Sequence, residues 1–245
     1  MNSPPLLVLD LDGTLVDTAG DLIGTLNHIL ADEHIPPLPL ATARPMLGAG
    51  ARALIERGLS AAGRSVSPVR LEEMYLAFLA RYEAHIADES RAFPGVEAAL
   101  DRFEAAGWAF AICTNKIEHP SVRLMSELGL AARFRAICGQ NTFPFCKPDP
   151  RALLATIERA GGDPQRAIMV GDSKTDIVTA QAAHVPVVAV DFGYTDRHVS
   201  EFAPDRVISH FDELWHAVQS LAQWRAEPCL DGAAADLLNE ALPGA

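Results

Sequence analysis

Residues 6–18 read Leu6-Leu7-Val8-Leu9-Asp10-Leu11-Asp12-Gly13-Thr14-Leu15-Val16-Asp17-Thr18. Four apolar residues lead directly into Asp10, which predicts a strand that is buried on both faces and ends at this aspartate. Residues two apart in an extended chain point to the same side, so we expect the carboxylates of Asp10 and Asp12 to crowd one small volume. Their mutual repulsion requires a cation. Open α/β sheets bind ligands beyond the carboxyl ends of their strands, so this stretch predicts a chemical site.

A purely structural interpretation of the same residues is also available. Asp12 and the glycine after it form a common turn sequence, and either Asp17 or Thr18 could cap the helix that follows. This interpretation accounts for Asp12 but leaves Asp10, at the end of an apolar run, without a purpose. We therefore favour a site over a simple turn.

The composition excludes several classes of protein. The 245 residues are 49% hydrophobic and 21% charged, which is typical of a soluble globular protein with a substantial core. The 20 basic and 32 acidic residues give a net charge of -12, whereas a general nucleic-acid binder needs a basic face. An anionic substrate must therefore be attracted by a local cation. The first residues lack the basic start of a signal peptide and no apolar run is as long as a membrane span, so we expect a cytoplasmic protein without membrane contact.

The cysteines have no close metal-type spacing. Two of them fall in apolar, strand-like runs. We expect all of them to be buried thiols in a reducing cytoplasm: Cys113, Cys138, Cys146 and Cys229.

Residues 17–91 show only helical patterns. Apolar residues recur at helical spacing over 21–33, 51–59 and about 68–86, and no strand-like run interrupts them. A crossover between parallel strands normally needs only one helix, whereas this insert is roughly seventy residues long. We therefore expect residues 17–91 to form a second, smaller helical domain inserted after the first strand.

From residue 92 the pattern alternates between helix and strand. This alternation predicts an α/β fold with a doubly wound, mostly parallel, Rossmann-like sheet. We expect residues 1–16 and 92–225 to form this core, and the acidic, alanine-rich residues 226–245 to form either one short helix or a partly disordered tail. The expected strands are 108–114, 134–138, 167–170, 185–190 and 206–208, and the expected helices are 93–106, 121–128, 150–160, 175–183 and 212 to about 224.

Residues 10–18 resemble the first motif of the haloacid-dehalogenase-like hydrolases, in the branch of aspartyl-phosphate phosphatases. Three further parts follow in the family's order, and each lies at the end of a predicted strand. The resemblance extends from about Leu6 to Leu214. The three parts are Cys113-Thr114-Asn115-Lys116, Cys146-Lys147-Pro148-Asp149-Pro150 and Val170-Gly171-Asp172-Ser173-Lys174-Thr175-Asp176.

Each of these parts also has a simpler structural interpretation. A pair such as Thr114 and Asn115 commonly caps a following helix. A lysine before a proline-rich helix start, such as Lys147, is commonly a solvated surface charge. Asp172 and Asp176 could be helix-start carboxylates that interact with the helix dipole. This structural role is compatible with a role in a chemical site. The occurrence of all the parts in order favours the site.

The resemblance implies a role for each matching residue. Asp10 would attack phosphorus and form an aspartyl-phosphate, and Asp12 would protonate the leaving oxygen and then deprotonate the hydrolytic water. Thr114, Asn115 and nearby backbone amides would hold the phosphoryl group, and Lys147 would neutralise its oxygens. The acid at position 12 excludes the dehalogenase branch, which lacks it.

The resemblance also implies Mg2+ as the cofactor. The carboxylate of Asp10, the backbone carbonyl of Asp12 and the carboxylate of Asp172 would bind it. Asp176 would support either the metal or Lys147. Magnesium prefers oxygen ligands and usually retains waters and a substrate phosphate, which fits a site rich in carboxylates.

The helical insert resembles the small cap of this family, which closes over the site. Within it, Met46-Leu47-Gly48-Ala49-Gly50-Ala51-Arg52-Ala53-Leu54 is similar to the glycine-containing cap loop of phosphoglycolate phosphatases. Gly48 and Gly50 could simply form a turn before the next helix. Alternatively, amides exposed at that helix start, with Arg52 or Arg44 nearby, could bind a small carboxylate.

Scaffold similarity to the phosphoglycolate phosphatase subgroup extends to residues 93–96, 142–145 and 192–194. Two positions depart from the subgroup. Cys146 stands where a second lysine is common, which weakens the substrate assignment. His184 stands where a glycine usually ends a helix, and it would cost about 1 kcal/mol if its backbone is left-handed.

Together these resemblances imply a Mg-dependent phosphomonoesterase that hydrolyses 2-phosphoglycolate to glycolate and phosphate. Alternatives are a phosphatase for another small phosphorylated metabolite (a sugar phosphate or a nucleotide), a phosphomutase, and a non-catalytic phosphate-binding relative. A phosphomutase needs cap groups for two sugar positions, a signalling receiver domain carries its nucleophile on a later strand, and a non-catalytic relative would lack one of the core acids or the lysine. We expect a monomer or a homodimer that acts on a small phosphorylated metabolite.

Overall fold

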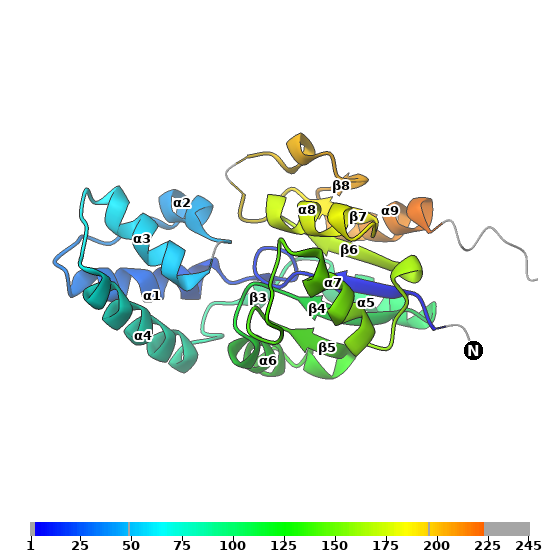
Figure 1. Ribbon diagram of the computed structural model, residues 1–245, viewed down its shortest axis with the longest axis horizontal. Coiled ribbons are helices and arrows are strands. Elements are labelled where there is room, and N and C mark those ends of the chain that lie inside the picture. Colours follow the sequence, from blue (N-terminus) through cyan, green and yellow to red (C-terminus); the bar gives the residue numbers. More distant parts are fainter. Residues whose placement is uncertain (1–2, 49, 196, 223–245) are drawn as a thin grey trace, which may run out of the picture.

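The computed structural model describes residues 3–48, 50–195 and 197–222 (Figure 1). Its main sheet consists of β1 (Leu6–Leu9), β4 (Ala109–Cys113), β5 (Phe134–Cys138), β6 (Ala167–Gly171), β7 (Val187–Val190) and β8 (Arg206–Ile208). The spatial order is β5-β4-β1-β6-β7-β8, and every neighbouring pair is parallel. This order confirms the predicted α/β fold, with the first strand in the interior of the sheet.

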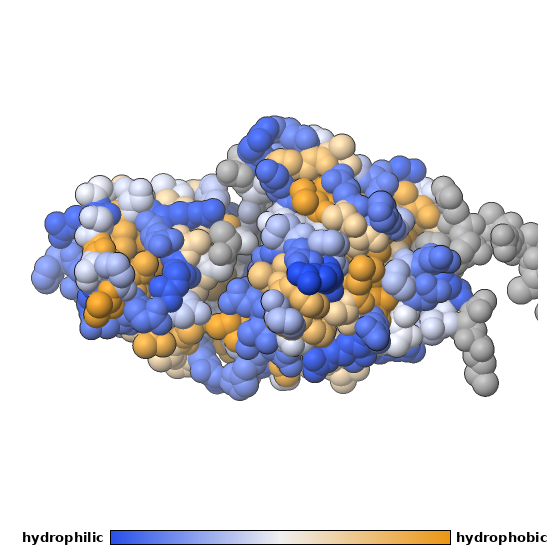
Figure 2. Space-filling model, viewed as in Figure 1, coloured by the Kyte–Doolittle hydropathy of each residue, from blue (hydrophilic) through white to orange (hydrophobic). Residues whose placement is uncertain are grey.

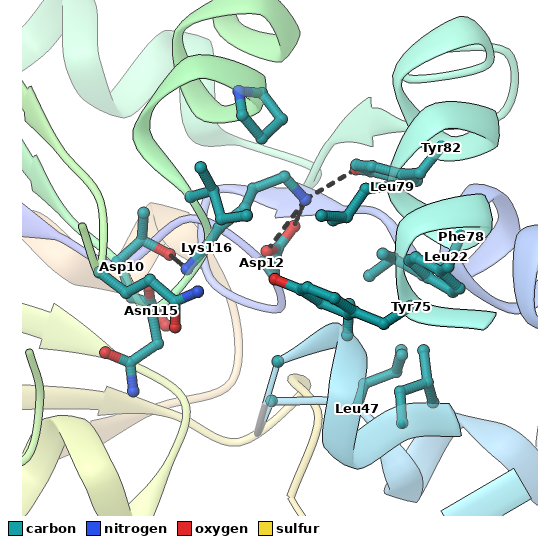
Figure 3. A pocket seen from close by; sticks show the side chains of 18 residues that line it. Asp10, Asp12, Leu22, Leu47, Tyr75, Phe78, Leu79, Tyr82, Asn115 and Lys116 are labelled. Atoms are coloured by element: carbon teal, nitrogen blue, oxygen red, sulfur yellow. Dashed lines mark hydrogen bonds and ion pairs between the residues drawn. The ribbon is translucent and has the colours of Figure 1, made fainter. Parts of the chain in front are cut away.

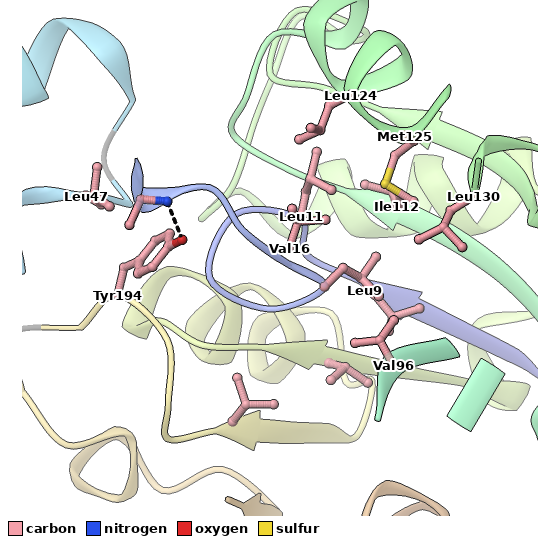
Figure 4. Close-up of a cluster of buried hydrophobic side chains, with 14 of the residues drawn as sticks. Leu9, Leu11, Val16, Leu47, Val96, Ile112, Leu124, Met125, Leu130 and Tyr194 are labelled. Carbon is pink, nitrogen blue, oxygen red and sulfur yellow. Dashed lines mark hydrogen bonds between the residues drawn. The ribbon is translucent and has the colours of Figure 1, made fainter. Parts of the chain in front are cut away.

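Strand β1 is apolar throughout because both of its faces are covered. Leu7 and Leu9 belong to one buried cluster of side chains (Figure 4), and Leu6 and Val8 belong to a second cluster. Each of the four is at most 1% exposed. Alternate residues of a strand point to opposite faces, so a continuous apolar run is what a strand between two helical layers requires.

Helices cover both faces of the sheet. They are α5 (Val96–Ala105), α6 (Glu118–Glu127), α7 (Pro150–Arg159), α8 (Lys174–Ala182) and α9 (Leu214–Leu221). Side chains of α5, α6 and α9 pack in the cluster that contains Leu9, and side chains of α7 and α8 pack in the cluster that contains Val8. The doubly wound arrangement predicted from the alternating pattern is therefore confirmed.

A group of helices lies beside the sheet, at the left of Figure 1. It consists of α1 (Ala19–Ala31), α2 (Leu40–Ala43), the 3-10 helix η1 (Arg44–Met46), α3 (Ala51–Ala61) and α4 (Pro68–Ala84). Helices α1, α3 and α4 pack on one another through buried side chains such as Leu26, Ile55 and Phe78. The entry and exit of this insert pair as antiparallel strands, β2 (Val16–Asp17) with β3 (Arg91–Ala92). We propose this strand pair as the boundary between cap and core.

Some helix boundaries differ from those that the sequence predicts. Helix α6 begins at Glu118, before Pro120, whereas the sequence predicts a start at Ser121. A proline fits the first turn of a helix because the amides there have no partner within the helix. Helix α2 and η1 are too short to show a periodic pattern. The remaining 3-10 helices are η2 (Ala131–Arg133), η3 (Pro164–Arg166), η4 (Val199–Phe202) and η5 (Phe211–Glu213).

One prediction about the cysteines is wrong. Cys113 and Cys138 are buried, as expected, but Cys146 is exposed. Its position explains the difference, because it lies in the loop between β5 and α7 and not in a strand. Cys229, the tail at 226–245 and the predicted helix end near 224 lie outside the described residues.

His184 follows α8 with a φ of 54°. The amide of Val185 donates to the carbonyl of Ala180 at 3.0 Å, which closes the end of the helix. A non-glycine residue therefore takes the left-handed conformation here, at the expected cost of about 1 kcal/mol.

The outer surface mixes polar and apolar residues. Figure 2 shows hydrophilic residues over much of one face, with apolar residues scattered between them on both the helical insert and the α/β core. Scattered apolar side chains are normal on a globular surface. Within the described ranges, none of the helices has the length and apolar character needed to cross a membrane.

Candidate active site

The first two aspartates of the motif lie at the carboxyl end of β1. The amide of Asp10 donates to the carbonyl of Val170 in β6 at 2.9 Å, which fixes the strand end. Gly13 then turns the chain with a φ of 86°, and its amide donates to the carbonyl of Val16 at 3.0 Å. Asp12 therefore lies in a turn, as the structural interpretation predicts, and it also lines a cavity.

Thr18 occupies the position before α1, but its side chain makes no capping hydrogen bond. Its hydroxyl instead donates to Asp12 Oδ1 at 2.8 Å. Asp17 Oδ1 accepts from the amide of Ala19 at 3.3 Å, so Asp17 and not Thr18 supplies a side-chain acceptor at the helix start. Thr18 therefore orients the carboxylate of Asp12.

Lys147 lies among the acidic residues. Its ammonium is 3.0 Å from Asp10 Oδ1 and 2.5 Å from Asp176 Oδ1, and its side chain is 2% exposed. Lys147 is therefore not a solvated surface charge. Asn115 Nδ2 donates to the carbonyl of Lys147 at 3.0 Å and so anchors the loop that carries the lysine. Burial alone would lower the pKa of Lys147, but the carboxylates of Asp10 and Asp176 raise it above its ordinary value.

Asp172 and Asp176 come from the loop and first helical turn that follow β6. Asp172 Oδ2 accepts from the amide of Tyr194 at 2.6 Å, and Asp172 Oδ1 accepts from the hydroxyl of Thr14 at 3.2 Å. Ser173 is the N-cap of α8, and Asp176 Oδ2 completes its capping box by accepting from the amide of Ser173 at 3.1 Å. Asp176 thus combines the structural role at the helix start with its contact to the buried lysine.

Asp10, Asp172 and Asp176 form a compact acidic cluster. One carboxylate oxygen of each lies within 4.8 Å of the others. A Cβ on Gly13 would lie 2.4 Å from Asp172 Oδ2, and a Cβ on Gly193 would lie 2.2 Å from Asp172 Cβ. The backbone therefore forms a cradle around this carboxylate that only glycine permits. Such an all-oxygen donor set fits a hard divalent cation.

Burial makes the negative charges of this cluster costly. It raises the pKa of Asp10 to about 6 and the pKa of Asp172 well above its ordinary value. When all groups are ionised, three carboxylates face the one positive charge of Lys147. A bound divalent cation would balance the excess negative charge.

Thr114 lies directly after β4 and is buried. Its Oγ1 accepts from the amide of Lys116 at 3.2 Å. Helix α6 begins at Glu118 with Ile117 in the preceding position, so neither Thr114 nor Asn115 caps that helix. Both residues line the cavity instead.

Lys116 is a site residue to which the sequence analysis assigned no role. Its Nζ lies 3.0 and 3.2 Å from the two carboxylate oxygens of Asp12 and 2.7 Å from Tyr82 Oη of α4 (Figure 3). The side chain of Lys116 is only 7% exposed. Burial alone would lower the pKa of Lys116, but Asp12 and Tyr82 raise it. The lysine is part of the second motif, but no residue pattern pairs it with a tyrosine of the insert.

The cavity lies between the insert and the strand ends of the core (Figure 3). The core contributes Asp10, Asp12, Thr114, Asn115 and Lys116 to its lining. The insert contributes apolar side chains and two tyrosines of α4. The remaining predicted core residues lie next to this wall, because Lys147 contacts Asp10, and Asp172 and Asp176 belong to the acidic cluster of Asp10.

The cap residues predicted to bind substrate are not all brought to the cavity. Gly48 and Gly50 line it, and Gly50 has a φ of 87° just before α3, so the predicted turn is also present. Arg52 does not line it, and its guanidinium pairs with Glu72 and stacks on the ring of Tyr75. Arg44 is also absent from the lining and pairs with an aspartate of β2 at 3.1 Å.

Tyr194 is a second residue with a larger role than the sequence pattern indicated. Its amide donates to Asp172, and its phenol oxygen accepts from the amides of Thr18 and Ala19 at 2.6 and 2.9 Å. The same hydroxyl donates to Asp17 Oδ1 at 2.6 Å. Tyr194 (Figure 4) therefore connects the acidic cluster to the start of α1.

A comparison with protein families agrees with this geometry. The model of the haloacid dehalogenase-like hydrolases matches residues 7–190. The chain belongs to this family. The match confirms the resemblance inferred from the four motifs.

Known proteins and a solved structure resemble the chain over most of its length. The phosphoglycolate phosphatase of Mesorhizobium japonicum is 54% identical over 212 residues, which are 86% of this chain and 93% of that protein. The phosphoglycolate phosphatase of Agrobacterium fabrum is 44% identical, over 87% of this chain and 92% of that protein. The crystal structure of a predicted phosphoglycolate phosphatase from Haemophilus somnus is 26% identical and has a TM-score of 0.82, covering 89% of this chain and 100% of that one.

Proposed function

We propose that this chain is a Mg2+-dependent phosphomonoesterase that works through an aspartyl-phosphate and hydrolyses 2-phosphoglycolate to glycolate and phosphate. The observation that carries the proposal is the position of Asp10, which lines the cavity, belongs to the acidic cluster and lies 3.0 Å from the ammonium of Lys147. The phosphoglycolate phosphatases that are 54% and 44% identical to the chain support the choice of substrate.

The first step transfers the phosphoryl group to Asp10. A carboxylate oxygen of Asp10 attacks phosphorus, a new P–O bond forms, and the P–O bond of the ester breaks. The leaving oxygen takes a proton from the carboxyl group of Asp12, which lines the same cavity. Thr18 and Lys116 hold the Asp12 side chain at 2.8 and 3.0 Å, so the acid has a fixed orientation.

The second step restores Asp10. Asp12, now a carboxylate, removes a proton from water, and the water oxygen attacks phosphorus. The P–O bond to Asp10 breaks and inorganic phosphate leaves. Asp12 then carries the proton needed for the next cycle, so one side chain serves as acid and as base.

The negative phosphoryl oxygens need positive or hydrogen-bonding partners in both steps. Lys147 supplies a charge, because its ammonium lies beside the nucleophile and is held in place by Asp176. The hydroxyl of Thr114 lies in the wall of the same cavity and would donate to a phosphoryl oxygen. These groups are fixed before substrate binds, so little reorganisation is needed during the reaction.

The acidic cluster would hold Mg2+ through the carboxylates of Asp10 and Asp172 and the backbone carbonyl of Asp12. The glycine cradle around Asp172 and the all-oxygen donor set support this assignment. When bound, the ion neutralises charge on the phosphoryl group.

Phosphate release from a panel of phosphomonoesters tests the proposal. The panel contains 2-phosphoglycolate, a sugar phosphate and a nucleotide, each measured with Mg2+ and with a chelator. We expect hydrolysis of 2-phosphoglycolate to require Mg2+ and to fall at least about 1000-fold in Asp10→Asn, because the nucleophile is lost. Asp101→Asn is the matched control, since this helix residue is 72% exposed and pairs with Arg133, and neither residue lines the cavity.

The outcomes separate mechanism from substrate. Preference for a different ester, lost in Asp10→Asn and kept in Asp101→Asn, would retain the mechanism and replace the substrate. Equal activity in the wild type and Asp10→Asn would contradict the aspartyl-phosphate mechanism. Release of no phosphate from any ester would contradict the proposed function as a whole.

A further inference from the structure

The cavity has an uneven distribution of charge. The wall that the insert contributes is largely apolar and includes Leu22, Leu47, Leu54, Phe78 and Leu79. Among the lining residues that the structure describes, only one basic side chain is present, and it belongs to the core residue that follows the Thr-Asn pair. An anionic group that enters beside the leaving-group position therefore has a single cation in the wall to meet it.

We propose that this cation, Lys116, binds the carboxylate of the leaving group and so selects phosphate esters of small hydroxy acids. The inference rests on the proposed function and names the residue that recognises the glycolate half of the substrate. In this role Lys116 is a specificity-determining residue, in addition to holding Asp12.

The distances around Asp12 fit a two-carbon hydroxy acid. Asp12 protonates the ester oxygen, so that oxygen must come within about 2.7 Å of its carboxyl group. Lys116 Nζ lies 3.0 Å from Asp12 Oδ1. In an ester of a two-carbon hydroxy acid, the ester oxygen and the nearer carboxylate oxygen are roughly 3 Å apart. One small leaving group can therefore reach the acid and the ammonium at the same time.

One N–H group of the Lys116 ammonium is available to hydrogen-bond to such an anion. A lysine ammonium carries three N–H donors and no acceptor. Tyr82 Oη lies at 2.7 Å and Asp12 Oδ1 at 3.0 Å, while Asp12 Oδ2 is the most distant acceptor at 3.2 Å. The third donor can pass from Asp12 Oδ2 to a substrate carboxylate without loss of the other two contacts.

Tyr82 of the insert contacts this ammonium and orients it. It lies on α4 of the insert, whereas Lys116 follows β4 of the core. Its ring is also 4.3 Å from Lys116 Nζ. The two neighbouring arginines do not line the cavity: Arg52 pairs with Glu72 and stacks on the ring of Tyr75, and Arg44 pairs with Asp17. The charge needed to recognise a carboxylate therefore comes from the core loop.

A pair of substrates measures this recognition directly. In 2-hydroxyethyl phosphate, a neutral hydroxymethyl group replaces the carboxylate of 2-phosphoglycolate. The quantity of interest is the ratio of kcat/KM for 2-phosphoglycolate to kcat/KM for 2-hydroxyethyl phosphate. We expect Lys116→Met to lower this ratio by about 10- to 100-fold, the range for loss of a hydrogen bond to a charged group. Both rates can also fall together, because Lys116 holds Asp12, but that common loss cancels in the ratio.

Matched variants control for charge and for folding. Arg135→Met removes a positive charge at an exposed position of β5, outside the four motifs and the cavity lining, and we expect it to leave both rates and their ratio unchanged. Lys116→Arg keeps the positive charge and should retain most of the ratio. If Lys116→Met fails to fold, Lys116→Gln gives the same comparison with a neutral side chain that can still hydrogen-bond to Tyr82 and Asp12.

Two results would overturn the inference. The first is that a neutral variant of Lys116 keeps the wild-type ratio of the two kcat/KM values, even if both rates fall. Lys116 would then act only through Asp12. The second is that this ratio falls in Arg52→Met but not in the neutral Lys116 variant. A residue of the insert, and not Lys116, would then bind the substrate carboxylate. A wild type that does not prefer 2-phosphoglycolate would instead refute the proposed substrate, so the two failures are distinguishable.

Discussion

Tyr194 holds the carboxylate of Asp172 through its backbone, with its amide 2.6 Å from Asp172 Oδ2. Its side chain holds the start of α1 through the amides of Thr18 and Ala19. One residue thus fixes a proposed metal ligand and the point where the chain enters the insert. The two ends of Tyr194 can be tested separately, because a side-chain substitution leaves the amide in place.

Tyr194→Phe should destabilise the protein while leaving its metal dependence intact. The change removes the acceptor for two buried amides, at an expected cost of about 1–3 kcal/mol in the free energy of unfolding. The amide that donates to Asp172 remains, so the Mg2+ concentration for half-maximal activity should change less than about threefold. Urea unfolding and a Mg2+ titration of activity measure the two effects. A shift in metal dependence without loss of stability would contradict this division of roles.

Asp21→Asn should loosen the junction between the first and last segments of the insert. Asp21 accepts from the amides of Glu89 and Ser90 at 2.9 and 2.8 Å and from the hydroxyl of Ser90 at 2.6 Å. An asparagine keeps one acceptor and turns an NH2 donor toward a backbone donor, so we expect a loss of about 1–3 kcal/mol in the free energy of unfolding. Asp32→Asn, at an exposed position just after α1, is the control and should change it by less than about 0.5 kcal/mol. Equal stability of the two variants in urea would refute the role of Asp21.

The sequence predicts those site residues whose positions follow from local patterns of apolar and polar residues. The apolar run before Asp10 predicts a buried strand, and the alternation of helix and strand predicts that Thr114 and Asp172 follow parallel strands. Parallel strands bring their carboxyl ends to one edge of the sheet, so residues far apart in the chain meet there. Lys147 could be predicted only through the family resemblance, because a lysine in a loop has no local pattern that requires burial.

Local sequence patterns do not predict the contacts between the helical insert and the α/β core. Lys116 contacts Tyr82 because α4 packs over the carboxyl ends of the strands. No residue pattern predicts how an inserted domain packs on the core. Arg52 is a residue for which the local pattern favours a role that the packing of the helices does not support. Its position beside the cap loop favours an anion-binding role, but its pairing with Glu72 depends on how α3 and α4 pack.

The cysteines should differ sharply in reactivity. Burial raises the pKa of Cys113 to about 11 and raises that of Cys138 above its ordinary value, and only the thiolate reacts readily. At pH 8 a thiol-specific chromogenic disulfide should therefore label the exposed Cys146 first, in a Cys229→Ser background that removes the thiol outside the described residues. Cys146→Ser should abolish the fast phase. A fast phase that persists in this variant would show that a buried thiol is accessible.

The raised pKa of Cys113 also has a consequence for stability at high pH. An unfolded cysteine has a pKa of 9.0, so the folded state binds the thiol proton more tightly than the unfolded state does. This contribution to the free energy of unfolding is fully present below about pH 9 and is lost as the pH rises to about 11. Cys113→Ala should therefore show a shallower fall in stability over this range than the wild type. Parallel slopes in urea unfolding at pH 8.5 to 10.5 would contradict the assignment.

Mg2+ should stabilise the folded protein through the acidic cluster, and Asp172→Asn should remove that effect. A ligand that binds only the folded state at a hundredfold excess over its Kd adds about 2.7 kcal/mol to the free energy of unfolding. The wild type and the control Asp101→Asn should both gain this amount when Mg2+ replaces chelator, whereas Asp172→Asn should gain less than about 0.5 kcal/mol. The reason is that Asp172 is one of the three buried carboxylates whose oxygens lie within 4.8 Å of one another. Urea unfolding at matched ionic strength isolates specific binding from screening, and an equal gain in all three proteins would show that Mg2+ binds elsewhere.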